Sequence, residues 1–89
     1  MQIDITTQIW KEGKVYVSYA KELDVSSFGK TVKEARNNLI EAVECFLETA
    51  EEMGTLDQIL EEAGYVRKKT IWKAPEVISL EKTRIPLPK

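Results

Sequence analysis

The residues of this chain that could do chemistry are almost all carboxylates. The 89-residue sequence has no histidine and a single cysteine, Cys45. These counts exclude a histidine general base, a disulfide within the chain and the common zinc sites. A two-metal nuclease is the remaining catalytic arrangement to consider, since it needs several carboxylates around two ions about 4 Å apart. Its candidate ligands are Asp4, Glu34 and Glu41.

The sequence pattern keeps these three carboxylates apart. Asp4 falls on the face of a predicted strand opposite Ile3 and Ile5, Glu34 is at the start of a predicted helix, and Glu41 is on the solvent side of that helix. We therefore expect no catalytic residues, no metal site and no cofactor, and a protein that is not an enzyme. Cys45 has no histidine or lysine in the same helical turn, so we interpret it as an ordinary, partly exposed thiol.

Charge is distributed unevenly along the chain, although the net charge is only −2. No lysine or arginine occurs between positions 37 and 66, whereas positions beyond 66 are mainly basic. The acidic residues of the first stretch are Glu41, Glu44, Glu48, Glu51, Glu52, Asp57, Glu61 and Glu62. The helical period places Glu44 and Glu48 opposite the apolar stripe. This face either keeps the protein soluble or meets a basic partner, for which charge complementarity raises the encounter rate.

Residues 31–53 carry the clearest structural signal and predict one long helix that positions the acidic face. Thr31 and Glu34 form a capping-box pattern at its start, and Gly54 is suited to the left-handed conformation after its last turn. The apolar residues recur at steps of three and four and form one stripe, made of Ala35, Leu39, Ala42, Val43, Phe46, Ala50 and Met53. A sheet is needed to cover this stripe.

The other segments are short and mostly predicted as strands. Residues 2–10 and 15–20 alternate between apolar and polar positions and are joined by a polar turn that contains Gly13, which predicts a hairpin. Residues 25–28 predict a third strand, and residues 55–64 a short helix with a second capping box, Thr55 with Gln58. Further strands are predicted over residues 65–72 and 77–85, followed by a loose, proline-rich end.

These elements predict an α+β fold: one antiparallel sheet, in the order β-β-β-α-α-β-β, covered by one long helix. The length allows a single domain, with a core over residues 1–64 and a β-hairpin tail with a loose C-terminus over residues 65–89. We expect a homodimer, since a chain this small gains from a shared core. No apolar run is long enough to span a membrane and no secretion signal is recognised, so a cytoplasmic protein is expected.

The first half of the chain resembles the HicB antitoxin family. The resemblance lies in residues 15–20 (VYVSYA), 22–25 (ELDV), 27–31 (SFGKT), 34–35 (EA) and 46–48 (FLE), in that order and with matching spacing. Many relatives have Pro-Gly after the Glu-Leu pair, where this chain has Asp24 and Val25. The second half is similar to short, stand-alone members of the family, through residues 64–65 (GY) and 72–76 (WKAPE).

This resemblance implies a partial ribonuclease-H-like fold and a non-catalytic antitoxin of a type II toxin-antitoxin system. Its partner would be a HicA-type toxin, a small basic ribonuclease that cuts messenger RNA. Many HicB proteins carry a DNA-binding module after this core. Here the residues after Gly64 are too few and too β-prone to form one, so direct DNA binding is not expected. The alternative is an orphan interaction or adapter domain without a toxin partner.

The partner surface is expected on the second half of the chain and on the acidic helix face. Strand edges and apolar side chains beyond Gly64 suit β-augmentation by a toxin or by a second copy of the chain. The predicted contact residues are Tyr65, Trp72, Val77, Ile78, Ile85, Glu44 and Glu48. The tyrosines and tryptophans are interpreted as core or dimer packing rather than as a stacking platform for nucleic acid, because no aromatic-basic motif of a known module accompanies them.

Overall fold

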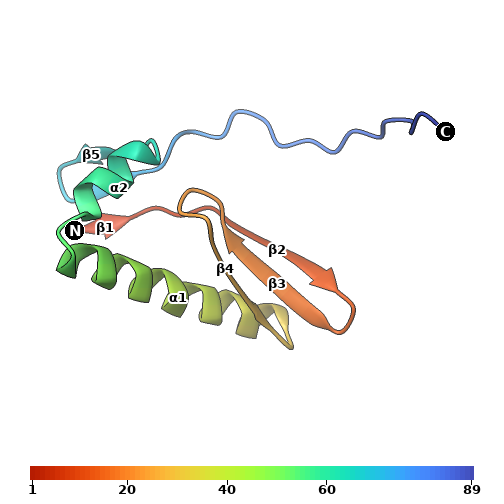
Figure 1. The fold of residues 1–89 in the computed structure, drawn as a ribbon, viewed down its shortest axis with the longest axis horizontal. Coiled ribbons are helices and arrows are strands. Elements are labelled where there is room, and N and C mark those ends of the chain that lie inside the picture. The colour runs from red at the N-terminus through yellow and green to blue at the C-terminus, as the bar shows by residue number, and fades with distance from the viewer.

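Helix α1, Val32–Glu52, is the longest element of the computed structural model, which describes residues 1–89 (Figure 1). The predicted capping box is confirmed in part: the Thr31 hydroxyl accepts a hydrogen bond from the Glu34 N–H at 3.0 Å, whereas the Glu34 carboxylate accepts one from the N–H of Lys30, the residue before the cap, at 3.2 Å. Gly54 ends the helix at a φ of +73°. The predicted residues 31–53 therefore match the helix together with its two capping positions.

Three strands form an antiparallel sheet against α1. They are β2 (Thr7–Glu12), β3 (Val15–Ala20) and β4 (Val25–Gly29), in the spatial order β2-β3-β4. Gly13, with a φ of +60°, allows the two-residue turn between β2 and β3. The predicted hairpin and the predicted third strand are confirmed, and α1 covers one face of this sheet (Figure 1).

A second sheet closes the other end of the molecule. It has the order β1-β6-β5, formed by β1 (Gln2–Ile3), β6 (Ile71–Lys73) and β5 (Val66–Lys68). β1 and β6 run parallel, whereas β5 and β6 are antiparallel. The prediction of one antiparallel sheet was therefore only partly right, since strands distant in sequence meet in a second sheet. The short helix α2 (Leu56–Glu62) packs beside α1, and Leu56 and Leu60 of α2 line a hollow together with Trp72 of this sheet.

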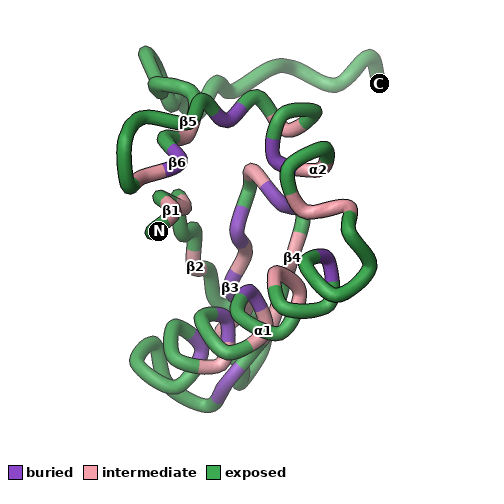
Figure 2. The backbone as a smooth tube through the Cα atoms, turned by 90° about the vertical axis from the view of Figure 1, so that its left-hand side faces the viewer, coloured by how far each residue is buried: buried purple, intermediate pink, exposed green.

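The core lies where α1, α2, the two sheets and the corner after β3 meet. Its buried residues are Ala20, Leu23, Leu39, Val43, Leu60, Tyr65 and Trp72. Figure 2 shows that buried positions gather on the inward sides of the elements and that the C-terminal segment is exposed along its length. No helix of the protein is both long enough and apolar enough to cross a membrane.

Three predicted strands differ from the structure because their backbone partners change. Residues 2–10 form two strands, since the Asp4 N–H bonds to Trp72 of β6 while the Thr6 N–H bonds to Glu22. Residues 65–72 contain a hairpin turn at Lys69, whose φ of +53° reverses the chain between β5 and β6. Residues 77–85 form no strand, because they have no neighbouring strand to bond.

The second predicted capping box was also wrong, although its helix exists. The Thr55 hydroxyl bonds to the Ala50 carbonyl at 3.4 Å instead of accepting a first-turn amide of α2, and the Gln58 side chain bonds to Glu62. Thr55 is thus used to close the turn between α1 and α2. Gly64 ends α2 at a φ of +92°.

Candidate partner-binding surfaces

The residues that carry the family resemblance form a structural joint between β3, β4 and the start of α1. The hydroxyl of Ser18, which is buried, donates a hydrogen bond to the Ala35 carbonyl at 2.7 Å. Gly29 lies so close to α1 that a Cβ atom there would be 2.6 Å from the Ala35 nitrogen. Asn38 donates a further bond to the Phe28 carbonyl at 2.8 Å. These residues therefore fix the helix against the sheet.

The corner formed by Glu22, Leu23 and Asp24 connects β3 to β4. Leu23 points into the core, and Asp24 has a φ of +55°, a conformation that aspartate tolerates better than most residues. The Glu22 carboxylate accepts a hydrogen bond from the Thr6 N–H at 2.9 Å. Partial burial acts to raise the pKa of Glu22, but the hydrogen bonds from Thr6 outweigh it and the pKa is lowered. The corner thus ties the β1–β2 connection to the end of β3.

Tyr65 and Trp72, both predicted as partner contacts, lie in the core. The Tyr65 hydroxyl donates to the Asp4 carbonyl at 2.6 Å, and burial, followed by the nearby negative charges of Glu22 and Asp4, raises the pKa of Tyr65. Trp72 packs in the same cluster, with the Arg67 guanidinium 5.9 Å from its ring centroid. Tyr65 thus bonds to the residue after β1, and Trp72 lies in β6 beside Ile3 of β1; contact with a partner stays a prediction for both residues.

The other predicted contact residues lie on two separate surfaces. Glu44 and Glu48 are exposed on α1. Val77, Ile78 and Ile85 are exposed on the C-terminal segment, which leaves the body on the side opposite α1 (Figures 1 and 2). The structure therefore does not bring the seven predicted residues into one site.

The uncovered face of the β2-β3-β4 sheet was not predicted from the sequence. The strand register brings Trp10 beside Val17 and Val17 beside Phe28, and the Phe28 side chain is 65% exposed. Trp10 and Tyr19 are in edge-to-face contact with ring centroids 6.4 Å apart. The Tyr19 hydroxyl donates to Asp24 at 2.8 Å, and this bond is the main reason why the pKa of Tyr19 is raised. Residues 15–20 have apolar side chains on both faces of the strand, and this pattern could have indicated a second apolar face of the sheet.

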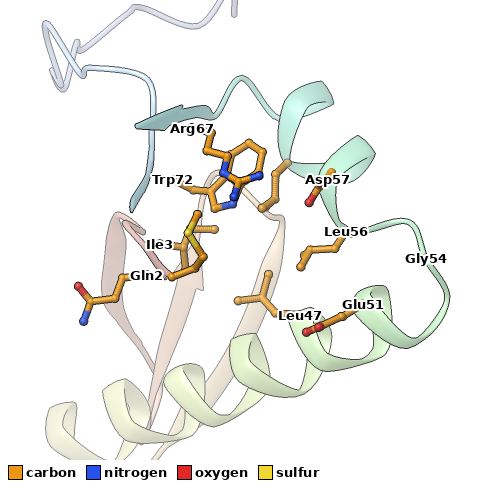
Figure 3. A pocket seen from close by; sticks show the side chains of 11 residues that line it. Gln2, Ile3, Leu47, Glu51, Gly54, Leu56, Asp57, Arg67 and Trp72 are labelled. Carbon is orange, nitrogen blue, oxygen red and sulfur yellow. The ribbon is translucent and has the colours of Figure 1, made fainter. Parts of the chain in front are cut away.

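An open hollow of about 560 Å³ lies between the end of α1, the start of α2 and the second sheet (Figure 3). Leu47, Leu56 and Trp72 form part of its apolar wall, and the charged residues at its rim include Glu51, Asp57 and Arg67 (Figure 3). No group of three or more acidic or cysteine side chains in the chain is arranged to hold a metal ion. The hollow therefore offers an apolar wall with a few charges at its rim.

Comparisons with protein-family models, with curated proteins and with solved structures find no match for this chain. The family resemblance therefore depends on the motif residues themselves.

Proposed function

We propose that this chain is a HicB-type antitoxin that binds and neutralises a HicA-type, mRNA-cleaving ribonuclease without being an enzyme itself. The observation that carries the proposal is the acidic outer side of α1, which has no lysine or arginine after Arg36. Its exposed carboxylates belong to Glu41, Glu44, Glu48, Glu51 and Glu52. An RNA-cutting toxin needs a basic surface for its substrate, and a rigid row of carboxylates competes for that surface.

The geometry of the motif residues supports the same proposal. The Ser18 hydroxyl and the close approach of Gly29 join the sheet to α1, and the side chains of Thr31 and Glu34 cap the start of that helix. Motif residues that pack and cap in this way define a scaffold on which a partner-binding surface can lie. A partial ribonuclease-H-like fold is part of the proposal, supported by three antiparallel strands followed by a helix and by a strand, β6, that returns parallel to β1.

Co-expression tests the proposal. The probe is the short, basic, histidine-containing protein encoded beside this chain, expressed from an inducible promoter. We expect its expression to arrest growth, this chain to relieve the arrest, and the two proteins to co-elute. Growth arrest that persists with the chain present, together with the absence of a complex, contradicts the proposal. The same holds if no such neighbour exists, and this result favours the alternative of an orphan adapter domain.

Charge reversal tests the role of the α1 surface within the complex. The variant Glu44→Lys/Glu48→Lys is expected to weaken toxin binding at least tenfold, mainly through a slower association rate at low salt. Glu61→Lys/Glu62→Lys changes the net charge equally but on α2, and is the matched control. Equal losses in both variants show that net charge rather than the α1 surface matters.

A further inference from the structure

The last fourteen residues, 76–89, form an extended segment that we call the C-terminal tail. No hydrogen bond joins it to the rest of the chain, and its large apolar side chains are in water: Ile78 is 85% and Leu80 82% exposed. Figures 1 and 2 both show the tail running clear of the sheets and of α1. A segment with this many exposed aliphatic residues gains free energy when it is covered.

The whole chain shows how much surface remains to be covered. Its radius of gyration is 15.5 Å, compared with about 12 Å for a compact domain of this length. Its accessible surface is 7304 Å², whereas a compact monomer of this mass exposes about 5,300 Å². The excess of about 2,000 Å² exceeds the roughly 800 Å² that each partner buries in an interface of standard size. One chain therefore carries enough uncovered surface for a stable dimer.

The edge of β2 offers the complementary surface. The Lys21 N–H bonds to the Thr6 carbonyl at 3.4 Å, and bonded pairs alternate along an antiparallel ladder. Backbone groups of Thr7, Ile9 and Lys11 therefore point away from β3. β2 is the outermost strand of its sheet, so these groups have no strand to bond. An unpaired edge of this kind is a template for another extended chain.

Side-chain space is available on both sides of this edge. On the side of α1, a hollow of about 380 Å³ has Ile9, Tyr16 and Val32 among its lining residues. On the other side the Trp10 ring is 38% exposed. An added strand would place Ile78 and Leu80 together on one face, since alternate residues share a face. The tail is free of proline between Pro75 and Pro86, a stretch longer than β2 itself.

We propose that residues 77–85 of one copy pair with the β2 edge of a second copy, and that the exchange is reciprocal, giving a two-fold symmetric dimer. A second copy is favoured over the chain's own β2, because residues 75–79 lie beside Lys21, Glu22 and Ala63 and lead the tail away from that edge (Figure 1). The surface excess of each copy is larger than the area that one partner buries in an interface of standard size. This inference needs no toxin and stands apart from the antitoxin proposal.

Sedimentation of the full-length protein over a range of concentrations tests the inference. The wild-type chain is expected to be a dimer, and Leu80→Asp to raise the dimer dissociation constant by about tenfold or more, as the loss of a buried leucine implies. Leu87→Asp is the matched control: this residue is equally apolar and exposed but lies beyond Pro86, outside the pairing stretch. It is expected to dimerise like the wild type.

The β2 edge is tested separately by a backbone change. Lys11→Pro removes an N–H that faces the open edge and leaves the bonds to β3 in place, whereas Lys11→Ala keeps the N–H. We expect the proline variant to dimerise more weakly than the alanine variant, and circular dichroism checks that both are folded. A monomeric wild type overturns the inference and leaves the tail for another partner. Equal dimerisation by Leu80→Asp and Leu87→Asp, or by both Lys11 variants, overturns it as well.

Discussion

Gly29 is the residue at which the joint between β4 and α1 leaves least space. A Cβ atom there would meet the Ala35 nitrogen at 2.6 Å and the Glu34 carbonyl carbon at 2.9 Å. Both are backbone atoms, which move only if the helix shifts. Gly29→Ala is therefore expected to lower the free energy of unfolding by about 2–3 kcal/mol, at the upper end of overpacking effects.

Urea denaturation followed by tryptophan fluorescence measures this loss. Gly13→Asn is the control, because nothing lies within 4 Å of a Cβ at position 13 and asparagine tolerates its φ of +60°. Its expected effect is below about 1 kcal/mol. If Gly29→Ala is as stable as Gly13→Asn, α1 shifts to accommodate the added Cβ atom without a loss in the free energy of unfolding, and the prediction is wrong.

Glu22 links stability to pH at the corner after β3. Its pKa in the folded protein is lowered from the ordinary value of 4.5, so the ionised carboxylate stabilises the fold above about pH 4.5. This contribution is lost as the pH falls through the lower folded-state pKa. Since the carboxylate is mostly in water, the contribution is at most about 1 kcal/mol.

The variant Glu22→Gln is expected to lack this contribution. The wild type should exceed it in unfolding free energy at pH 7, and the difference should shrink by pH 3, measured by urea denaturation at both values. Glu61→Gln on α2 controls for the loss of one carboxylate elsewhere. A difference between wild type and Glu22→Gln that stays constant from pH 7 to pH 3 contradicts the assignment.

Among the elements, the two helices have threonines at equivalent positions with different roles. The Thr31 hydroxyl caps the first turn of α1, whereas the Thr55 hydroxyl makes no cap bond to α2. Thr31→Ala is therefore expected to cost about 1 kcal/mol, and Thr55→Ala clearly less. Thermal unfolding by circular dichroism compares the two variants. Equal losses of stability in the two variants would show that the hydrogen bond of the Thr31 hydroxyl adds nothing to the stability of α1.

Elements with local signals were predictable from the sequence. α1, the β2–β3 hairpin, β4 and the second helix follow from periodicity, a glycine turn and glycine-ended helices. What could not be predicted were the partners of short strands. Residues 2–3 pair with residues 71–72, far apart in sequence, and Lys69 takes a positive φ without being a glycine. Alternation alone shows which residues share a face, not which strand lies beside them.

The candidate site was predictable only in part, for the same reason. Exposure of Glu44 and Glu48 follows from the helical period, and the apolar content of the tail is visible in the sequence. The burial of Tyr65 and Trp72 depends on the parallel pairing of β1 with β6, which no local pattern indicates. An aromatic residue in a short strand suits a core and an interface equally well until its neighbours are known.

For the whole molecule, tail exchange makes thermal stability depend on protein concentration. Dissociation into monomers accompanies unfolding of such a dimer, so mass action favours the folded dimer at higher concentration. For a chain of this size, we expect the midpoint Tm to rise by about 3 °C for a tenfold rise in concentration. Differential scanning calorimetry over a concentration series measures the slope.

The tail variants separate this effect from nonspecific association. Leu87→Asp should keep the concentration dependence, since this side chain lies outside the pairing stretch. In Leu80→Asp the dependence should move to higher concentrations, because a charged carboxylate must then be buried in the pairing interface. At the concentrations of the series that variant should unfold as a monomer, with a Tm that stays constant. If the Tm of the wild type does not change with protein concentration, a second copy does not cover the tail, and the inference is wrong.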